Sequence, residues 1–398
     1  MRPFEDTRFW DRFVEALNGD ALWRETAWHY PGRWEVGTSE GLVTIDVRDG
    51  RAVSIARGPH RMGARLTVRG EQEAWDRLLR SETDWFKASQ TGDLEVSGDV
   101  VGAFRNVRAL WRFVELAQSL VGAPPPPAPA ADAVPSGAET TGRYIDVGGL
   151  RVHVEEAGSG RPIICFHAAG TDGALFRNVL AGLSDRYRVI AVDAPAHGRS
   201  SPPEGGAFTR LEQFADFLEA TIAALELERP ILLGCSLGAN LTLELASRRP
   251  GAYAAVVSAQ GADHTPNLNP DMVDLFAANG QLIVGQWGHS LTGSRTSPRR
   301  RAEVEWVLSR ATPEVMVADL RCYNGFDARE RTPLIDCPVL LVRGDEDWLV
   351  PLAQVEATAS RIPDVEIAEL AGTGHHPMIE NPEEFNEAVR GFLAKHDL

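Results

Sequence analysis

Residues 231–240, with the sequence ILLGCSLGAN, constrain the fold of this chain more than any other segment. An apolar run of strand length ends in the pattern Gly-x-Ser-x-Gly, and a leucine-rich helical pattern follows directly. In this context the pattern indicates a sharp turn that holds a serine in a strained, exposed conformation. Side chains at Gly234 and Gly238 would collide with the neighbouring strand and helix. We therefore expect Ser236 to be a nucleophile at a helix start, although chance matches to so short a pattern also occur in ordinary turns.

The remainder of the chain after residue 143 alternates between strand-like and helical segments, which predicts an α/β fold with a mostly parallel sheet. The expected strands lie at residues 144–147, 150–155, 162–166, 188–192, 230–233, 253–258, 339–342 and 365–370. Between the expected strands at 253–258 and 339–342, the alternation of strand and helix gives way to helical pieces at 272–278, 302–308 and 313–323. We expect this insertion, at about residues 262–332, to be a helical lid broken at Asn279-Gly280, Gly285, Gly288 and Gly293.

The first 121 residues have a different pattern, with helical periodicity at both ends and β-rich segments between. They predict a smaller N-terminal α+β domain that holds seven of the ten tryptophans, at positions 10, 23, 28, 34, 75, 85 and 111. Residues 122–142 are rich in proline and alanine and lack periodicity, as is typical of an extended linker. The predicted division is therefore 1–121, 122–142 and 143–398.

Composition excludes some functions. The net charge of −16 argues against nucleic-acid binding, which requires a basic face. No stretch approaches the 18 apolar residues of a membrane span, so we expect no stable membrane insertion. Four cysteines, at 165, 235, 322 and 337, fit no zinc pattern, and three stand in apolar contexts typical of buried reduced thiols. We expect a cytoplasmic protein without a metal or other cofactor.

A serine hydroxyl needs an imidazole base, and the imidazole needs a carboxylate that fixes its tautomer. His375 follows Gly372-Thr373-Gly374 on a loop after the last expected strand, which would let it reach the serine. His376 is the alternative base. His375 fits better because Pro377 and two apolar residues lead from His376 into the closing helix.

Three carboxylates crowd the loop after the strand at 339–342: Asp345, Glu346 and Asp347. A solvated acidic turn explains two of them. Asp347 has the better position for the acid, because Gly344 turns the chain before it and Pro351 starts the next helix. For the oxyanion we expect the backbone N–H groups of Leu237 and Ala169, with Ala168 as the alternative to Ala169.

Residues 143–398 resemble the α/β-hydrolase superfamily in four segments. These segments are His167-x-x-Gly170 after a strand, Asp193-Ala-Pro-Ala-His197-Gly-Arg-Ser200, the Gly-x-Ser-x-Gly turn, and the pair Gly344-x-x-Asp347 with Gly374-His375-x-Pro377-x-x-Glu380. The resemblance implies an α/β-hydrolase fold, a Ser-Asp-His triad and a structural role for His197. The sequence departs from the usual pattern in having His167-Ala168 where His-Gly is common, which makes the oxyanion loop bulkier.

The first domain resembles the sterol carrier protein 2-like family over residues 64–70 with the Trp75 helix, and over residues 92–99 with the helix that follows. That resemblance implies an apolar tunnel for a lipid. The simpler alternative is that the tryptophans only fill the core of a small domain.

Together these features predict a serine hydrolase that cleaves a carboxylic ester of a hydrophobic small molecule through an acyl-enzyme. Lactone, thioester or carbon–carbon bond hydrolysis by the same triad is the alternative. A serine nucleophile disfavours epoxide and haloalkane hydrolysis, which need a carboxylate. The lid residues Trp287, Trp306 and Tyr323 are candidates for substrate binding, or else they pack the lid. A non-catalytic binder of a hydrophobic ligand is the alternative of another class.

Overall fold

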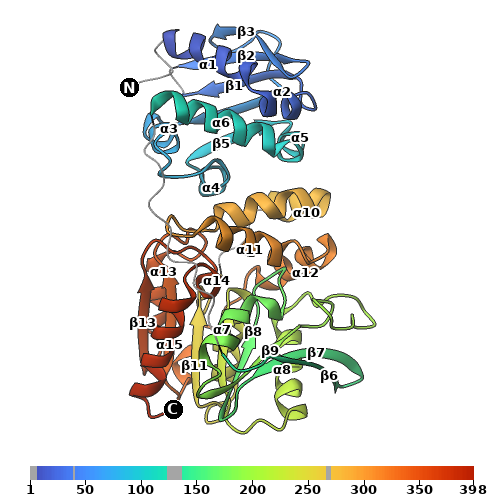
Figure 1. Ribbon diagram of the computed structural model, residues 1–398, viewed down its shortest axis with the longest axis vertical. Coiled ribbons are helices and arrows are strands. Elements are labelled where there is room, and N and C mark those ends of the chain that lie inside the picture. Colours follow the sequence, from blue (N-terminus) through green and yellow to red (C-terminus); the bar gives the residue numbers. More distant parts are fainter. Residues whose placement is uncertain (1–6, 39–40, 123–136, 266–269) are drawn as a thin grey trace. The chain divides into compact units, whose positions relative to one another are not determined.

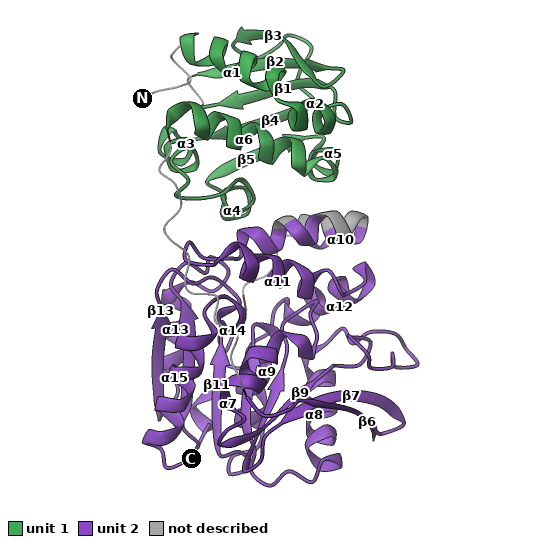
Figure 2. Ribbon diagram, viewed as in Figure 1, with its two compact units in different colours: residues 1–126 green, residues 127–398 purple. Residues whose placement is uncertain are grey.

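The computed structural model describes residues 7–38, 41–122, 137–265 and 270–398. The chain forms two compact units, residues 1–126 and residues 127–398, which Figure 2 shows in separate colours. Most of the predicted linker, residues 123–136, lies outside the described residues. Strand β6 begins at Thr141, so residues 141 and 142, the last two of the predicted linker, belong to the sheet instead.

The first unit is built on a five-stranded sheet in the order β3-β2-β1-β4-β5, in which β1 and β4 are parallel and the other pairs antiparallel. Its strands are β1 (Gly32–Gly37), β2 (Leu42–Arg48), β3 (Arg51–Arg57), β4 (Leu66–Gly70) and β5 (Leu94–Gly98). Its helices are α1 (Thr7–Gly19), α2 (Ala21–Ala27), α3 (Gln72–Leu79), α4 (Trp85–Thr91), α5 (Val100–Arg105) and α6 (Val107–Val121).

Local sequence explains most of these elements. Asp49 and Gly50 both have positive φ, as a two-residue turn between β2 and β3 requires. The helix that the sequence pattern predicts after residues 92–99 is instead two helices, α5 and α6, because the chain turns at Asn106, whose side chain donates to the Gly102 carbonyl. Trp23 and Trp34 pack edge to face in the core with Phe113 beside both rings.

The second unit is built on an eight-stranded sheet in the order β13-β12-β11-β10-β8-β9-β7-β6, parallel from β13 to β9 and antiparallel at β7 and β6 (Figure 1). Its strands are β6 (Thr141–Val147), β7 (Leu150–Ala157), β8 (Arg161–Phe166), β9 (Tyr187–Val192), β10 (Ile231–Cys235), β11 (Ala255–Ala259), β12 (Val339–Gly344) and β13 (Val365–Leu370). The mostly parallel sheet that the sequence predicts is confirmed.

Helices cover both faces of this sheet. The helical elements are η1 (Gly173–Phe176), α7 (Arg177–Leu183), α8 (Leu211–Ala224), α9 (Leu237–Arg248), α10 (Pro270–Ser290), α11 (Pro298–Leu308), α12 (Pro313–Tyr323), η2 (Thr332–Leu334), α13 (Leu352–Ala359), α14 (Pro377–Glu380) and α15 (Pro382–Lys395). The connection through α7 runs from β8 towards one edge, whereas those through α8, α9 and α13 run towards the other. Right-handed crossovers therefore place α7 opposite α8, α9 and α13, and α15 packs against α7.

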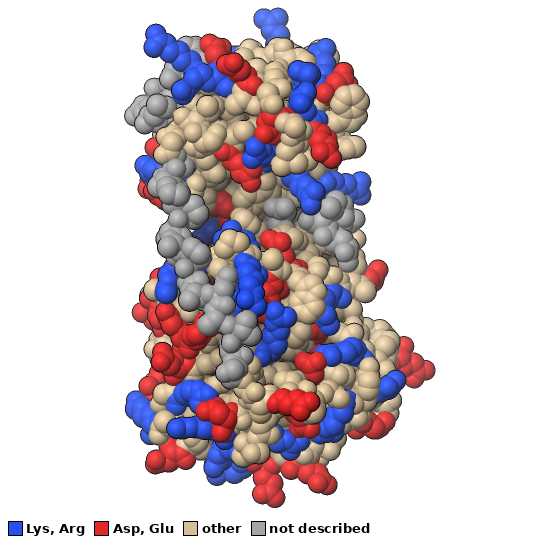
Figure 3. All heavy atoms as spheres, in the orientation of Figure 1, with Lys and Arg blue, Asp and Glu red and all other residues tan. Residues whose placement is uncertain are grey.

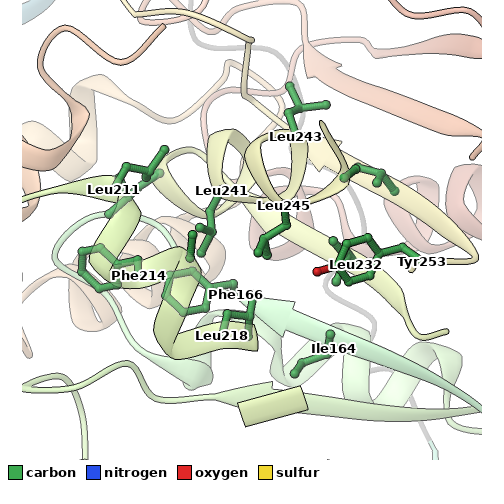
Figure 4. Close-up of a cluster of buried hydrophobic side chains, with 14 of the residues drawn as sticks. Ile164, Phe166, Leu211, Phe214, Leu218, Leu232, Leu241, Leu243, Leu245 and Tyr253 are labelled. Atoms are coloured by element: carbon green, nitrogen blue, oxygen red, sulfur yellow. The ribbon is translucent and has the colours of Figure 1, made fainter. Parts of the chain in front are cut away.

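The core between α8, α9 and the sheet holds the serine turn in place. Leu241 and Leu245 of α9 lie among Phe166, Phe214 and Leu232, all fully or almost fully buried (Figure 4). Burial of one leucine side chain contributes about 1.5–3 kcal/mol, so this cluster strongly favours one position for the start of α9.

The lid insertion consists mainly of α10, α11 and α12. The prediction that Asn279-Gly280, Gly285 and Gly288 break the first lid helix is wrong, because α10 runs through all of them. Two of these glycines serve close packing instead. A Cβ at Gly280 would lie 3.3 Å from Pro313, and one at Gly288 would lie 3.0 Å from Leu308. They let α10 approach the neighbouring helices closely. From the sequence alone, a glycine that permits close packing looks the same as one that ends a helix.

Charged side chains are mixed on the face of the protein drawn in Figure 3, where Lys and Arg are interspersed with Asp and Glu. A nucleic-acid-binding domain presents instead a continuous basic face.

Candidate active site

Ser236 stands in the strained turn that the sequence pattern predicts, at the carboxyl end of β10 and directly before α9. Its φ of 54° and ψ of −114° are rare for a residue with a side chain. Its N–H donates to the Ala259 carbonyl at 2.9 Å. A Cβ at Gly234 would lie 2.1 Å from the Gly238 carbonyl oxygen, and one at Gly238 would lie 2.0 Å from that of Phe166. Only glycine fits at both positions, so the pattern has a steric cause.

His375 and Asp347 form a buried pair at the same edge of the sheet. Asp347 follows β12 and His375 follows β13, and Nδ1 of the imidazole lies 2.8 Å from Oδ2 of the carboxylate. The other carboxylate oxygen accepts from the Leu349 N–H at 2.8 Å. Because a carboxylate only accepts, the Nδ1 atom carries the proton, and Nε2 of neutral His375 is left as the basic nitrogen.

Two contacts bring the His375 loop to the serine turn. The thiol of Cys235, the residue before Ser236, lies 3.7 Å from the His375 carbonyl oxygen. Gln260, which follows the neighbouring strand β11, donates from Nε2 to the Gly374 carbonyl oxygen at 2.5 Å. Segments about 140 residues apart in the sequence are thus joined beside the nucleophile candidate.

The alternative base, His376, has other contacts. Its N–H donates to Glu380, and its Nδ1 has no hydrogen-bond partner among the described residues. Burial, and then the charge of His375, hold the pKa of His376 well below its ordinary value. His376 therefore lacks the carboxylate partner that a general base needs, and the geometry favours His375.

The other two carboxylates of the acidic loop serve structural contacts. Glu346 accepts from the N–H and the hydroxyl of Ser294 in the lid, and Asp345 accepts weakly from the Thr373 N–H at 3.4 Å. Of the three carboxylates, Asp347 is the one that is hydrogen-bonded to an imidazole.

Glu380 is a buried support for the His375 loop that the sequence reasoning quoted but assigned no role. Its carboxylate accepts from the N–H groups of Gly293, Gly374 and His376 and from the Thr296 hydroxyl, at 2.6–2.9 Å. The side chain thereby joins the end of the lid to the residues on both sides of His375.

The oxyanion loop, residues 167–171, is fixed by its inward-facing carbonyl. The Ala168 carbonyl oxygen accepts from Nδ1 of His167 at 2.9 Å and from both the N–H and the hydroxyl of Thr171, at 3.2 and 2.8 Å. In a planar trans peptide the next N–H points the opposite way. The Ala169 N–H is therefore directed away from these three donors, while the Ala168 N–H is not fixed by this contact.

A second group of contacts holds this loop, and the sequence reasoning missed it. Asp319, on α12, accepts through Oδ2 from the Gly170 N–H at 2.7 Å and from Nε2 of His197 at 2.9 Å. His197 also donates from Nδ1 to the Pro195 carbonyl at 2.9 Å. The one available signal was a charged residue within the apolar run of α12. The resemblance implied that His197 is structural, and its contacts agree with that.

The candidate substrate residues differ in surroundings. Trp287 is buried and packs edge to face against Trp348, which directly follows Asp347. Burial and then the charge of Asp347 raise the pKa of Tyr323. Trp306 is 45% exposed and its ring lies under the guanidinium of Arg310 at 4.6 Å. Trp287 thus packs against the residue that follows the acid, whereas the contacts of Trp306 are with arginine.

The described residues contain no group of three or more His, Cys, Asp or Glu side chains placed to hold a metal ion. Every helix within the same residues is too short or too polar to span a bilayer.

The model of the alpha/beta hydrolase family matches residues 163–388. The 2-(acetamidomethylene)succinate hydrolase of Mesorhizobium japonicum is 27% identical over 63% of this chain and 94% of its own length. The pimeloyl-[acyl-carrier protein] methyl ester esterase of Aeromonas hydrophila is 26% identical over 61% of this chain and 100% of its own length.

Among solved structures, the enol-lactonase from Burkholderia xenovorans superposes with a TM-score of 0.57 at 22% identity, over 63% of this chain and 100% of its own. That likeness shows the fold alone. The family match covers more than half of the 398 residues. This chain therefore belongs to the alpha/beta hydrolase family.

Proposed function

We propose that this protein is a serine hydrolase that cleaves the carboxylic ester of a hydrophobic small molecule. Ser236 is the nucleophile, His375 the general base and Asp347 the carboxylate that orients the base. The observation that carries the proposal is the buried 2.8 Å hydrogen bond between His375 and Asp347, joined through Cys235 to the strained turn of Ser236.

The chemistry follows from these positions. Ser236 Oγ attacks the ester carbonyl while Nε2 of His375 takes the hydroxyl proton, and the imidazolium then gives that proton to the departing alcohol. The N–H groups of Leu237 and Ala169 stabilise the negative charge on the carbonyl oxygen. In the second half, His375 activates water, which cleaves the acyl-enzyme and returns the serine.

The choice of an ester is supported by a relative and by the lid. One relative is named as a methyl ester esterase, and Trp287 of the lid packs against Trp348, the residue after Asp347. We propose that Trp287 and Tyr323 contact the substrate. Trp306, which is partly exposed, would contact the substrate from the outer side of the lid. A lactone, a thioester or a carbon–carbon bond next to a carbonyl suits the same triad, and another fold neighbour is named as an enol-lactonase.

A hydrolysis panel tests the bond that is cleaved. We expect p-nitrophenyl esters of medium acyl chains to be hydrolysed faster than lactones or thioesters, and Ser236→Ala to remove turnover of all three. Faster hydrolysis of lactones or thioesters would replace the ester proposal with the alternative. Absence of turnover, together with no labelling of the folded protein by a fluorophosphonate, would favour a non-catalytic binder of a hydrophobic ligand.

For the first unit we propose a domain similar to sterol carrier protein 2 that binds a hydrophobic molecule. Support comes from a small apolar cavity, which would have to widen to admit a ligand and is lined by Trp34, Val36, Leu66, Val68, Trp75, Trp85, Leu110, Phe113 and Val114. A fluorescent fatty acid titrated into the full-length Ser236→Ala protein should bind, and Val68→Phe should weaken that binding by filling the cavity. Equal affinity in both proteins would contradict the proposal.

The cellular setting is part of the same proposal. All four cysteines are buried free thiols, which suits a reducing compartment such as the cytoplasm. The partner that we propose is a small hydrophobic ester, rather than a nucleic acid or a membrane.

A further inference from the structure

A carboxylate from the lid is buried against the oxyanion loop. Asp319 lies in the middle of α12, and neither its side chain nor that of His197 has any exposed surface. Its Oδ2 atom receives the Gly170 N–H at 2.7 Å and the His197 Nε2 proton at 2.9 Å. Lid and loop are thus joined by a direct hydrogen bond to the loop backbone, across 149 residues of sequence.

The charge of this carboxylate is matched. Both ring nitrogens of His197 donate, one to Asp319 and one to the Pro195 carbonyl, which only an imidazolium can do. The neighbouring His167 accepts the Ala194 N–H through Nε2 and is therefore neutral. One buried positive charge faces one buried negative charge, while Oδ1 of Asp319 has no hydrogen-bond partner among the described residues.

The loop is held from two sides. On the inner side, His167 and Thr171 hold the Ala168 carbonyl. On the outer side, α12 lies so close that a Cβ at Gly170 would be 2.0 Å from Cε of Met316, and Asp319 holds the Gly170 N–H. The Ala169 N–H lies in the same planar peptide as the Ala168 carbonyl, and the Gly170 N–H lies in the next peptide. The two planes meet at the Ala169 Cα atom and can turn about its two soft dihedrals, so the two anchors together set the position and direction of the Ala169 N–H.

We propose that Asp319 is a positioning residue that directs the Ala169 N–H towards the developing oxyanion, so that the lid completes the oxyanion hole. The inference rests on the proposed serine hydrolase function. Asp319 does not touch the reacting atoms, and it acts through Gly170. Through its carboxylate, catalysis depends on the position of α12. The triad and the Ser236 turn do not by themselves create that dependence.

Three variants separate positioning from general packing. Asp319→Ala removes the acceptor of the Gly170 N–H. Asp319→Asn can keep an oxygen in the place of Oδ2, where it still accepts from the Gly170 N–H and from Nε2 of His197, while its amide nitrogen takes the place of the unpartnered Oδ1. Leu320→Ala is the matched control, because Leu320 is the next residue of α12 and is also buried, at 6% exposure.

The expected result is a specific loss of kcat on the best p-nitrophenyl ester. Loss of a complete oxyanion donor costs 10²–10³ in kcat, so a misdirected donor in Asp319→Ala should cost roughly 30- to 100-fold, with KM changed less than about threefold. Asp319→Asn should stay within about threefold of the natural protein, and Leu320→Ala likewise.

The inhibition constant of a tetrahedral inhibitor distinguishes positioning from a merely structural role, which would leave that constant unchanged. The inhibition constant of an alkylboronic acid should rise in Asp319→Ala by about the same factor as kcat/KM falls, because its adduct places an oxygen in the oxyanion hole. Asp319→Asn should restore tight inhibition.

The outcomes are distinguishable. Unchanged kcat in Asp319→Ala, or an equal loss in Leu320→Ala, would overturn the positioning role while Ser236→Ala still tests the hydrolase itself. If Asp319→Ala does not fold, the double variant His197→Phe with Asp319→Leu removes both buried charges and still lacks the acceptor. It should show the same loss of kcat, and full activity would refute the inference.

Discussion

Nδ1 of His375 lies 2.8 Å from Oδ2 of Asp347, and both side chains are at least 95% buried. An amide at position 347 would keep the shape of this contact but stabilise the wrong tautomer of the imidazole. We therefore expect Asp347→Asn to lower kcat by about 10⁴ at neutral pH, with the fold retained. Steady-state hydrolysis and circular dichroism measure the two quantities.

The neighbouring Asp345→Asn is the control for that variant, because Asp345 has only a long contact to the Thr373 N–H. It should retain activity within about threefold. Equal losses in the two variants would mean that the acidic loop acts as a whole, and the assignment of Asp347 would be wrong.

Glu380 should be a major source of stability for the catalytic loop. Glu380→Ala leaves four buried donors without their acceptor, and each orphaned donor costs about 1–3 kcal/mol. We expect the free energy of unfolding in urea to fall by about 4 kcal/mol or more. Glu384→Gln, which removes a half-exposed pair with Arg295, should cost less than about 1 kcal/mol, and a similar loss in both would contradict this account.

Two glycine substitutions should have opposite effects. A Cβ at Gly238 would meet the Phe166 carbonyl oxygen at 2.0 Å, so Gly238→Ala should cost about 3 kcal/mol or prevent folding. At Gly285, inside α10, no atom lies within 4 Å of the added Cβ, and alanine should stabilise the helix by up to about 1 kcal/mol. Thermal unfolding of both variants checks the signs, and a stable Gly238→Ala protein would exclude the tight turn.

Stability should fall in mild acid because of His167. Burial, followed by the charge of His197, lowers the pKa of His167 from 6.5 to about 4. Between these values the unfolded chain binds more protons at this site than the folded protein does. The free energy of unfolding therefore rises with pH across the window and levels off above 6.5, by about 3 kcal/mol in all.

His197 contributes with the opposite sign and at higher pH. Burial alone would lower its pKa, but the charge and hydrogen bond of Asp319 outweigh burial and raise it above 6.5. Its stabilisation is complete below 6.5 and is lost as the pH rises through the folded value. Urea titrations from pH 4 to 7 should show a shallower slope in His167→Gln, and an unchanged slope would show that other groups carry the acid sensitivity.

The Ser236 turn and the contact between Asp347 and His375 were predictable because each depends on a short sequence pattern. Gly234 is required by a contact within the turn and Gly238 by the close approach of Phe166 on strand β8, and His375 stands on a glycine-flanked loop directly after a strand. A parallel sheet then gathers the carboxyl ends of its strands at one edge, so the order of segments was enough to bring Asp347 and His375 together.

The packing of the lid helices could not be predicted from the sequence in the same way. Gly280 and Gly288 appear as helix breakers in the sequence, whereas their effect is to let α10 pack closely on Pro313 and Leu308. The contact of Asp319 with the Gly170 N–H depends on how α12 settles on a loop 149 residues away. No local pattern encodes such a contact, and only the charge within an apolar helix hinted at it.

The central claim, that Ser236 is the nucleophile, is tested most directly by mapping its covalent adduct. The full-length protein would be treated with a fluorophosphonate and digested, and the modified peptide would be sequenced by mass spectrometry. The account predicts one stoichiometric adduct on Ser236, which is absent when Asp347→Asn is treated for the same short time. An adduct on another residue, or none on folded protein that still hydrolyses esters, would contradict it.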